Sequence, residues 1–157
     1  MKVKLILIGK TNHDYLRTGI SEYQNRLVHY LPFEIITIAD LKNTKKISKD
    51  QLKMKEGERI LNQLQKLDYV VLLDEKGKEF SSVNFSNWIE KQMVAGLKNL
   101  VFIIGGAYGF SEPVYQRSNF KMALSKMTFS HQMVRLIFVE QLYRAMTILK
   151  GEPYHHQ

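Results

Sequence analysis

The element that decides the fold is a strand ending in a glycine turn, Val101-Phe102-Ile103-Ile104-Gly105-Gly106-Ala107-Tyr108-Gly109. A continuous run of branched apolar residues is typical of a strand buried on both faces of a parallel sheet. Glycine has no Cβ, so the main chain after the strand can approach a ligand closely. The spacing matches neither GxGxxG nor GxxxxGK[ST], which disfavours a dinucleotide site and a P-loop. On its own, such a turn is more often structural than ligand-binding.

On both sides of this strand, the chain alternates apolar runs with segments of helical spacing. Three further runs predict strands at 3–8, 33–39 and 69–74, and helical spacing predicts helices over 14–31, about 60–67, 82–97 and about 131–150, with a short one from Ser111. This order predicts an α/β fold, with a mostly parallel sheet and helices on both faces. The polar segment 74–80 is predicted to be a turn at a carboxyl strand end, where parallel sheets bind ligands.

Length and composition bound the remaining possibilities. The 157 residues fit one domain, 1–157, and the shares of 45% hydrophobic and 24% charged residues are ordinary for a folded soluble protein. A chain without cysteine has no disulfide, thiolate nucleophile or Cys-based metal site, so the cytoplasm is the expected compartment. The five histidines show no ligand spacing with acidic partners, and no segment approaches the length of a membrane span, so neither a metal nor a membrane is expected.

The net charge of +8 favours a polyanionic partner such as nucleic acid or a ribosome. The excess of positive charge is greatest between Leu41 and Lys55, a segment with six lysines and one acidic residue, Asp50. The lysines are Lys42, Lys45, Lys46, Lys49, Lys53 and Lys55. Two interpretations are equally good. The segment contacts phosphates, with the salt dependence that such contacts bring, or it is a solvated loop.

The helix expected over 131–150 is apolar on nearly all sides, although a surface helix needs only one apolar stripe. It must therefore be buried within the domain or shared with a second subunit, and in so small a domain a homodimer is favoured. Its polar residue Arg144 can pair with Glu140 four residues earlier, or can meet a phosphate or a developing anion. After the stop signal Gly151 and Pro153, the tail Tyr154-His155-His156 offers stacking and hydrogen-bonding groups. On composition alone it also fits a purification-tag remnant or a disordered end.

Several blocks of the final third, taken in order, resemble one family. These blocks are Gly105-Gly106-x-x-Gly109, Leu124-Ser125-x-Met127-Thr128-Phe129-x-His131, Val134-Arg135, Glu140-Gln141-Leu142-Tyr143-Arg144-Ala145 and Gly151-Glu152-Pro153-Tyr154-His155. Together they are similar to the ribosomal RNA large subunit methyltransferase H family of the SPOUT superfamily, whose members methylate N3 of a pseudouridine in large-subunit (23S) rRNA. The resemblance covers the whole chain in length and element order. One departure is Ser130, which stands where the family usually has proline and can instead cap the following helix.

The resemblance implies a C-terminal trefoil knot, a homodimer and the cofactor S-adenosylmethionine. The cofactor-binding residues that it implies are Leu73, Gly105, Gly106, Leu124, Ser125, Lys126, Met127, Thr128 and Phe129. The tail then resembles the family's terminal motif, which removes the tag interpretation. We hypothesise that His155 or Tyr154 orients the base or receives the N3 proton, while Arg144 stabilises negative charge on the uracil ring.

Two alternative functions follow from the same residues. The basic charge and the lysine segment also suit a non-enzymatic factor that binds RNA or the ribosome, which would not bind S-adenosylmethionine. Other SPOUT enzymes act on tRNA. The small chain, without an added RNA-binding domain, favours the preassembled ribosomal surface over tRNA.

Overall fold

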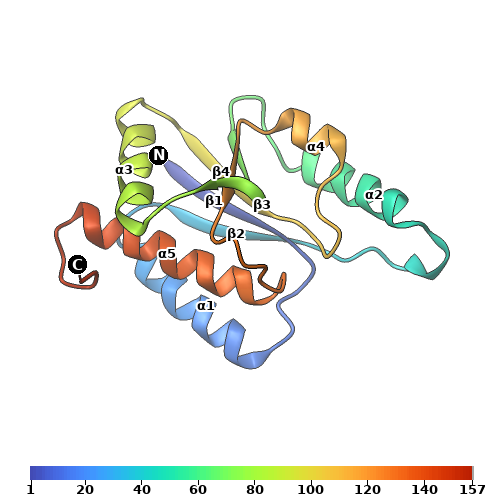
Figure 1. Ribbon diagram of the computed structural model, residues 1–157, viewed down its shortest axis with the longest axis horizontal. Coiled ribbons are helices and arrows are strands. Elements are labelled where there is room, and N and C mark those ends of the chain that lie inside the picture. The colour runs from blue at the N-terminus through green and yellow to red at the C-terminus, as the bar shows by residue number, and fades with distance from the viewer. Residues whose placement is uncertain (157) are drawn as a thin grey trace.

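A five-stranded, all-parallel sheet in the order β2-β1-β4-β3-β5 forms the centre of the computed structural model, which describes residues 1–156 (Figure 1). The strands are β1 (Lys2–Ile8), β2 (Phe33–Ile38), β3 (Tyr69–Glu79), β4 (Asn99–Ile104) and β5 (Phe120–Ala123). The helices are α1 (Asp14–Leu27), the 3-10 helix η1 (Thr44–Lys46), α2 (Lys49–Leu61), α3 (Ser82–Val94), α4 (Glu112–Arg117) and α5 (Met133–Leu149). The predicted α/β class with a parallel sheet is confirmed. The trefoil knot stays a prediction.

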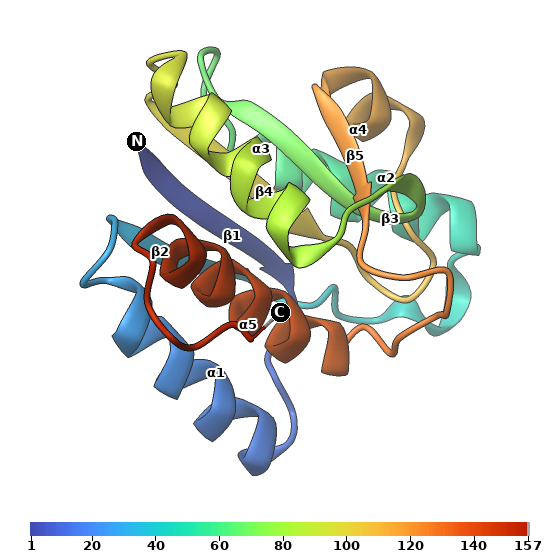
Figure 2. The ribbon, with the colours of Figure 1, turned by 60° about the vertical axis from the view of Figure 1, so that its left-hand side comes forward.

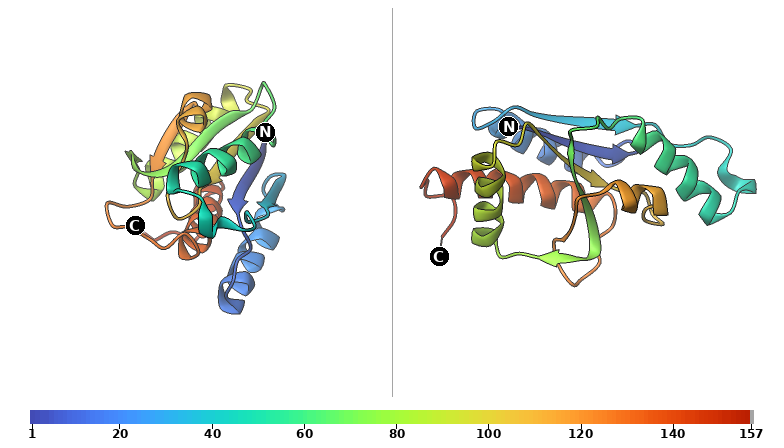
Figure 3. Two further views of the ribbon diagram at one scale, coloured as in Figure 1. Left: turned by 90° about the vertical axis from the view of Figure 1, so that its right-hand side faces the viewer. Right: turned by 90° about the horizontal axis from the view of Figure 1, so that it is seen from above.

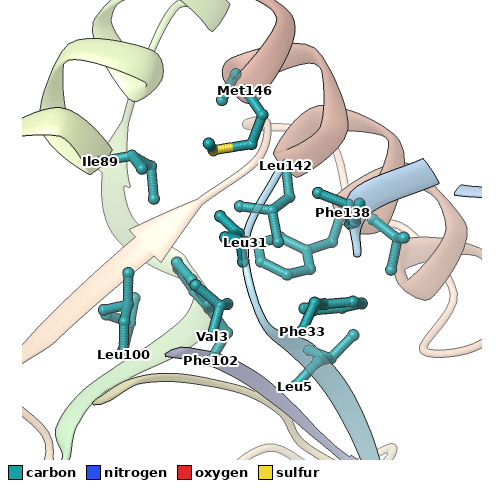
Figure 4. Packing of buried hydrophobic residues seen from close by; sticks show 14 of the residues in the cluster. Val3, Leu5, Leu31, Phe33, Ile89, Leu100, Phe102, Phe138, Leu142 and Met146 are labelled. Carbon is teal, nitrogen blue, oxygen red and sulfur yellow. The ribbon is translucent and has the colours of Figure 1, made fainter. Parts of the chain in front are cut away.

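Helices cover both faces of the sheet, as predicted. On one face α5 packs between α1 and α3 (Figure 2), and its Phe138, Leu142 and Met146 meet apolar side chains of β1 and β4 (Figure 4). The rings of Phe102 and Phe138 lie 4.7 Å apart, centroid to centroid. On the other face, α2 and α4 bury a smaller cluster around Ile60 and Val114. Most residues of β1 and β4 are apolar because both faces of these strands are covered.

The third strand corrects one prediction. The polar segment 74–80 is mostly not a turn, because β3 continues through Glu79 and shifts register between Leu73 and Lys78 to pair with β5. Gly77 permits this crossing, since a Cβ there would lie 2.5 Å from the backbone nitrogen of Met122. The short strand β5 was not predicted at all.

The first and last predicted helices are close to the observed ones, but the second is not, because α2 spans Lys49–Leu61 whereas helical spacing predicted about 60–67. The first helix ends at Leu27 rather than Leu31, and α5 begins at Met133 rather than near His131. Gly151 has the positive φ of a helix C-terminal stop, as expected. Because α5 runs from the pocket described below to the C-terminal tail, it fixes both of the regions that carry candidate functional residues (Figure 1).

Candidate functional site

A cavity of about 570 Å³ opens where β3, β4 and β5 end. These three strands are neighbours in the sheet, so their carboxyl ends meet at one edge, which is where open parallel sheets bind ligands. The lining residues come from the middle of β3, from the end of β4 and the glycine turn, from α4, from the end of β5 and the segment that connects it to α5, and from the first turn of α5. They are Leu73–Lys76, Ile104–Phe110, Tyr115, Met122–Ser125, Met127–His131 and Val134.

The glycine turn after β4 has little room for side chains. A Cβ on Gly105 would lie 3.0 Å from the ring of Phe110, and one on Gly106 would lie 2.7 Å from a carboxylate oxygen of Glu56. Gly109 has a φ of +83°, a conformation that favours glycine. The turn therefore presents main chain to the cavity, which is the ligand-permissive geometry that its composition suggested.

The segment 124–131 closes the other side of the cavity and is held by hydrogen bonds. The Ser125 hydroxyl accepts from the Met127 amide at 3.0 Å, and the Thr128 hydroxyl donates to the Glu75 carboxylate at 3.1 Å. The Ser130 hydroxyl accepts from the amide of Met133, the first residue of α5, at 3.1 Å, although the residue in the N-cap position is Gln132 rather than Ser130. The segment is thus attached to β3, through Glu75, and to α5.

One polar corner of the cavity carries negative charge. The Tyr115 hydroxyl donates to the Asp74 carboxylate at 2.5 Å, and the backbone amide of Lys76 donates to the same side chain at 2.8 Å. Burial and this hydrogen bond raise the pKa of the Tyr115 phenol well above its usual range. The phenol therefore stays a neutral donor while Asp74 remains available to a cationic group of a ligand.

The three candidate catalytic residues form a separate cluster at the far end of α5. Arg144 pairs with Glu140, lies 4.7 Å from the centroid of the Tyr154 ring, and has its Nη1 3.3 Å from Nδ1 of His155. The Tyr154 hydroxyl donates to Glu140 at 2.9 Å. The tail is therefore folded against the helix rather than extended, which argues against a merely disordered end.

This geometry bears on both roles considered for Arg144, which are the ion pair with Glu140 and contact with a phosphate or a developing anion. The hydrogen bond that Arg144 donates to Glu140 raises the pKa of Arg144, so the guanidinium remains a permanent cation. A guanidinium only donates, so Nδ1 of His155 must accept, and the neutral imidazole carries its proton on Nε2. Burial, with hydrogen bonds to Tyr23 and Glu140, raises the pKa of Tyr154 well above its usual range, which disfavours a tyrosinate base.

The cavity and the tail cluster are separated along α5. Val134 lines the cavity and Arg144 lies ten residues further on, which corresponds to a rise of about 15 Å along the helix. None of the residues 144, 154 and 155 lines the cavity. In contrast, every predicted cofactor-binding residue except Lys126 does, and Lys126 is exposed beside it.

Several lining residues were not predicted, among them Asp74, Tyr115 and His131. Asp74 carried a usable signal, because it directly follows an apolar run at a carboxyl strand end. Tyr115 carried none, because its position depends on how α4 packs. Within residues 1–156 no cluster of His, Asp and Glu has the arrangement to hold a metal ion, and no helix is long and apolar enough to cross a membrane.

Comparison with known proteins agrees with this geometry. Residues 1–155 match the family model described as "Predicted SPOUT methyltransferase". The chain therefore belongs to the SPOUT methyltransferase family, and it is an α/β methyltransferase with its candidate donor pocket at the carboxyl ends of β3, β4 and β5.

Its relatives narrow this class to one kind of enzyme. Proteins named "Ribosomal RNA large subunit methyltransferase H" from Parabacteroides distasonis and Christiangramia forsetii are 61% and 60% identical over 157 residues, which is all of this chain and all of each relative. A protein of the same name from Cytophaga hutchinsonii is 58% identical over 99% of this chain and all of the relative. The family resemblance inferred from the sequence is thereby confirmed.

Proposed function

We propose that the protein transfers a methyl group from S-adenosylmethionine to N3 of a pseudouridine in large-subunit ribosomal RNA, acting on the assembled ribosome in the cytoplasm. The observation that carries the proposal is the cavity at the carboxyl strand ends, which is built from the segments that resemble the family. The full-length relatives named for large-subunit rRNA methylation support the substrate class. The pseudouridine N3 target rests on the family resemblance.

The residues present fit S-adenosylmethionine. The cavity volume of about 570 Å³ lies within the range of small-molecule pockets, roughly 300–1,000 Å³. Gly105 and Gly106 line the cavity with main chain at positions where an added Cβ would crowd Phe110 or Glu56, and Asp74 offers an anion to a cationic ligand. Leu73, the two glycines and the 124–129 segment would hold the donor, which when bound supplies an electrophilic methyl group on a sulfonium. The chain's own task is to align that methyl group with N3 and exclude water.

The separation of tail and cavity supports a homodimer in which each site is completed by the partner. Within one chain, α5 carries the tail cluster away from the cavity that its first turn lines. A two-fold related copy would place the same surfaces reciprocally, so that Arg144 of the partner subunit can approach this cavity. Most apolar side chains of α5 are buried in its own chain, so a shared interface would use half-buried ones such as Ile137 and Ile148.

In that arrangement the tail orients the base and balances its charge. Removal of the N3 proton leaves negative charge on the uracil ring, which the permanent cation Arg144 can stabilise. His155 in its Nε2–H form offers a donor, and Tyr154 stays a neutral phenol. Of the two candidates for receiving the proton, His155 is favoured, because breaking its contact with Arg144 would free Nδ1.

A labelled-methyl assay tests the proposed activity. Assembled ribosomes, free large subunits and tRNA are offered in parallel, and S-adenosylmethionine binding is measured by calorimetry. We expect donor binding, with transfer to ribosomes. Label on tRNA alone would refute the ribosomal target, and absent donor binding would point to a non-enzymatic RNA-binding factor.

Side-chain roles are tested with His155→Ala and Arg144→Ala at saturating ribosomes. Arg17→Ala is the matched control, because Arg17 also forms an ion pair on a helix surface, with Asp14. We expect the tail variants to lose about 100-fold or more in turnover, since each removes a group that acts only on the reacting base. Near-normal turnover in both would exclude the proposed roles.

The shared site is tested by complementation. Gly106→Val, whose added atoms collide with Glu56 and so displace the glycine turn that lines the cavity, is co-expressed with Arg144→Ala, and the heterodimer is purified through two different tags. A tail acting in the partner's cavity leaves one intact site of two, so about half of the wild-type activity returns. If the tail acted in its own chain's cavity, both sites would be defective and no activity would return.

A further inference from the structure

The lysine segment of the chain lies at the cavity end of the molecule. Residues 41–49 include Lys42, Lys45, Lys46 and Lys49, all exposed, and no acidic residue. Seen from above, η1 and α2 extend to the end of the molecule opposite the C-terminal tail (Figure 3). Among the ion pairs of residues 1–156, the one in this region joins Lys53 to Asp50. Four neighbouring cations are thus left facing solvent.

This segment is held in a defined position. Ser48 and Gln51 form a reciprocal capping box at the start of α2, with hydrogen bonds of 3.1 and 3.2 Å. Further along α2, Arg59 donates to the backbone carbonyl of Ala39 at 2.8 Å, which anchors the helix next to the end of β2. The lysines are therefore carried on a fixed scaffold rather than on a loose loop.

One contact connects the segment directly to the cavity. The ammonium of Lys49 lies 5.1 Å from the centroid of the Tyr108 ring, and Tyr108 lines the cavity while remaining about half exposed. Lys49, the last lysine of the segment, consequently lies beside a residue that lines the cavity. The solvated-loop interpretation accounts for the exposure of the lysines but not for this placement.

The position of Lys49 at the start of α2 is also unfavourable for the stability of that helix. Lys49 is the first residue of α2, where a cation opposes the helix dipole at a cost of roughly 0.3–1 kcal/mol. The same dipole favours an anion at this end. Asp50 in the same turn offsets part of this cost, whereas Lys42, Lys45 and Lys46 form no ion pair within residues 1–156 and are suited to an external polyanion.

We infer that residues 42–49 form the surface that contacts the phosphate backbone of the RNA strand next to the target nucleotide. The inference rests on the proposed methylation of ribosomal RNA and adds the part of the chain that holds the strand at the cavity. Each lysine that neutralises a phosphate releases a counterion, so binding should be salt-dependent through these side chains.

The test compares two triple charge reversals of equal net charge. One changes the surface at the cavity, and the other changes exposed lysines near the amino ends of the strands, at the opposite edge of the sheet. The first variant is Lys45→Glu, Lys46→Glu and Lys49→Glu; the control is Lys66→Glu, Lys91→Glu and Lys98→Glu. For each, the methyl-transfer KM for ribosomes, the turnover, the donor affinity and the thermal midpoint are measured from about 50 to about 200 mM salt.

We expect the first variant to raise KM about ten-fold or more and to reduce the slope of log KM against log salt by about 2 to 3. Donor affinity should be unchanged, and the thermal midpoint should not fall, because a glutamate at the first residue of α2 suits the helix dipole. The control should stay within about two-fold of wild type. An equal effect in both variants, or none in the first, overturns the inference. Failure of the wild type to transfer methyl to any RNA would instead overturn the proposed function.

Discussion

Replacing the buried Arg135 with methionine should destabilise the protein and loosen the cavity together. Arg135 is completely buried on α5, and Figure 1 shows how this helix spans the cavity end and the tail end of the chain. Its guanidinium donates to the backbone carbonyls of Ile8 at 2.7 Å and Gly9 at 2.9 Å, and its Nε donates to the carbonyl of His131 at 3.1 Å. A further bond reaches the Thr11 hydroxyl at 3.1 Å. One side chain thus ties the end of β1 to a residue that lines the cavity.

The magnitude follows from these bonds. A hydrogen bond to a charged group contributes about 1.5–3 kcal/mol, so losing several would cost more than 5 kcal/mol if nothing opposed it. Methionine also removes the cost of burying a cation, which is several kcal/mol, and keeps much of the volume. We therefore expect a net loss of about 3 kcal/mol in the free energy of unfolding, which is roughly 6–12 °C in thermal midpoint for a chain of this length.

Urea unfolding and calorimetry measure the two consequences. The free energy of unfolding should fall by the stated amount in Arg135→Met, and donor affinity should fall about ten-fold even well below the new midpoint, because the 128–131 segment loses its link to β1. Arg135→Lys should recover part of the stability, since an ammonium can reach fewer of the acceptors. Arg17→Met on the surface is the control and should change stability by less than about 0.5 kcal/mol. A loss below about 1 kcal/mol in Arg135→Met would show that the four bonds do not hold the fold together.

Three further substitutions probe the sheet crossing, a titrating group and the tail. Gly77→Ala should lower the thermal midpoint by several degrees, because its Cβ would lie within 2.5 Å of the β5 backbone; an unchanged midpoint would mean that the crossing can relax. Burial and the charge of Asp40 raise the pKa of Glu56 in the folded protein above its ordinary value of 4.5. Protonated Glu56 therefore stabilises the fold at pH values below 4.5, and this stabilisation is lost as the pH rises through the raised pKa. Glu56→Gln should therefore be more stable than wild type at neutral pH, with the difference vanishing below pH 4.5 in urea titrations; a constant difference would contradict this. Tyr154→Phe should preserve the shape of the pH–rate profile, since the raised pKa keeps the phenol neutral; loss of an ionisation from the profile would assign Tyr154 as the base.

Most of the sheet could be predicted because its central strands obey a local rule. Strands β1 and β4 are covered on both faces, so nearly every residue in them is apolar and the pattern is visible in the sequence. The strand β5 follows no such rule. It has four residues, Phe120–Ala123, and includes the exposed Lys121, and its pairing with β3 depends on a register shift made elsewhere in the chain. The polar composition of residues 74–79 likewise gave no sign that β3 continues through them and pairs with β5.

The candidate site was predictable to the extent that its backbone requires special residues. The glycine turn carries its geometry in its composition, because a Cβ at Gly106 collides with a neighbouring side chain. Tyr115 and Asp74 meet only after α4 has packed beside β3, so their hydrogen bond is a tertiary event that no local pattern encodes. The position of the tail was equally invisible, since Tyr154 is held by Tyr23 from the other end of the sequence.

The length of α5 explains why a pocket and a candidate catalytic tail at the two ends of one helix are more compatible with the proposed dimer than with a single chain. Seventeen residues span about 25 Å, with the cavity beside the first turn and Arg144 beyond the middle. If two copies of α5 pack antiparallel about a two-fold axis near the helix centre, the last turns of one lie beside the first turns of the other. Each tail then reaches the partner's cavity without any element unfolding, whereas reaching its own would require the tail to leave Glu140 and Tyr23. The contacts that hold the tail in one chain are thus the same contacts that would present it to the other.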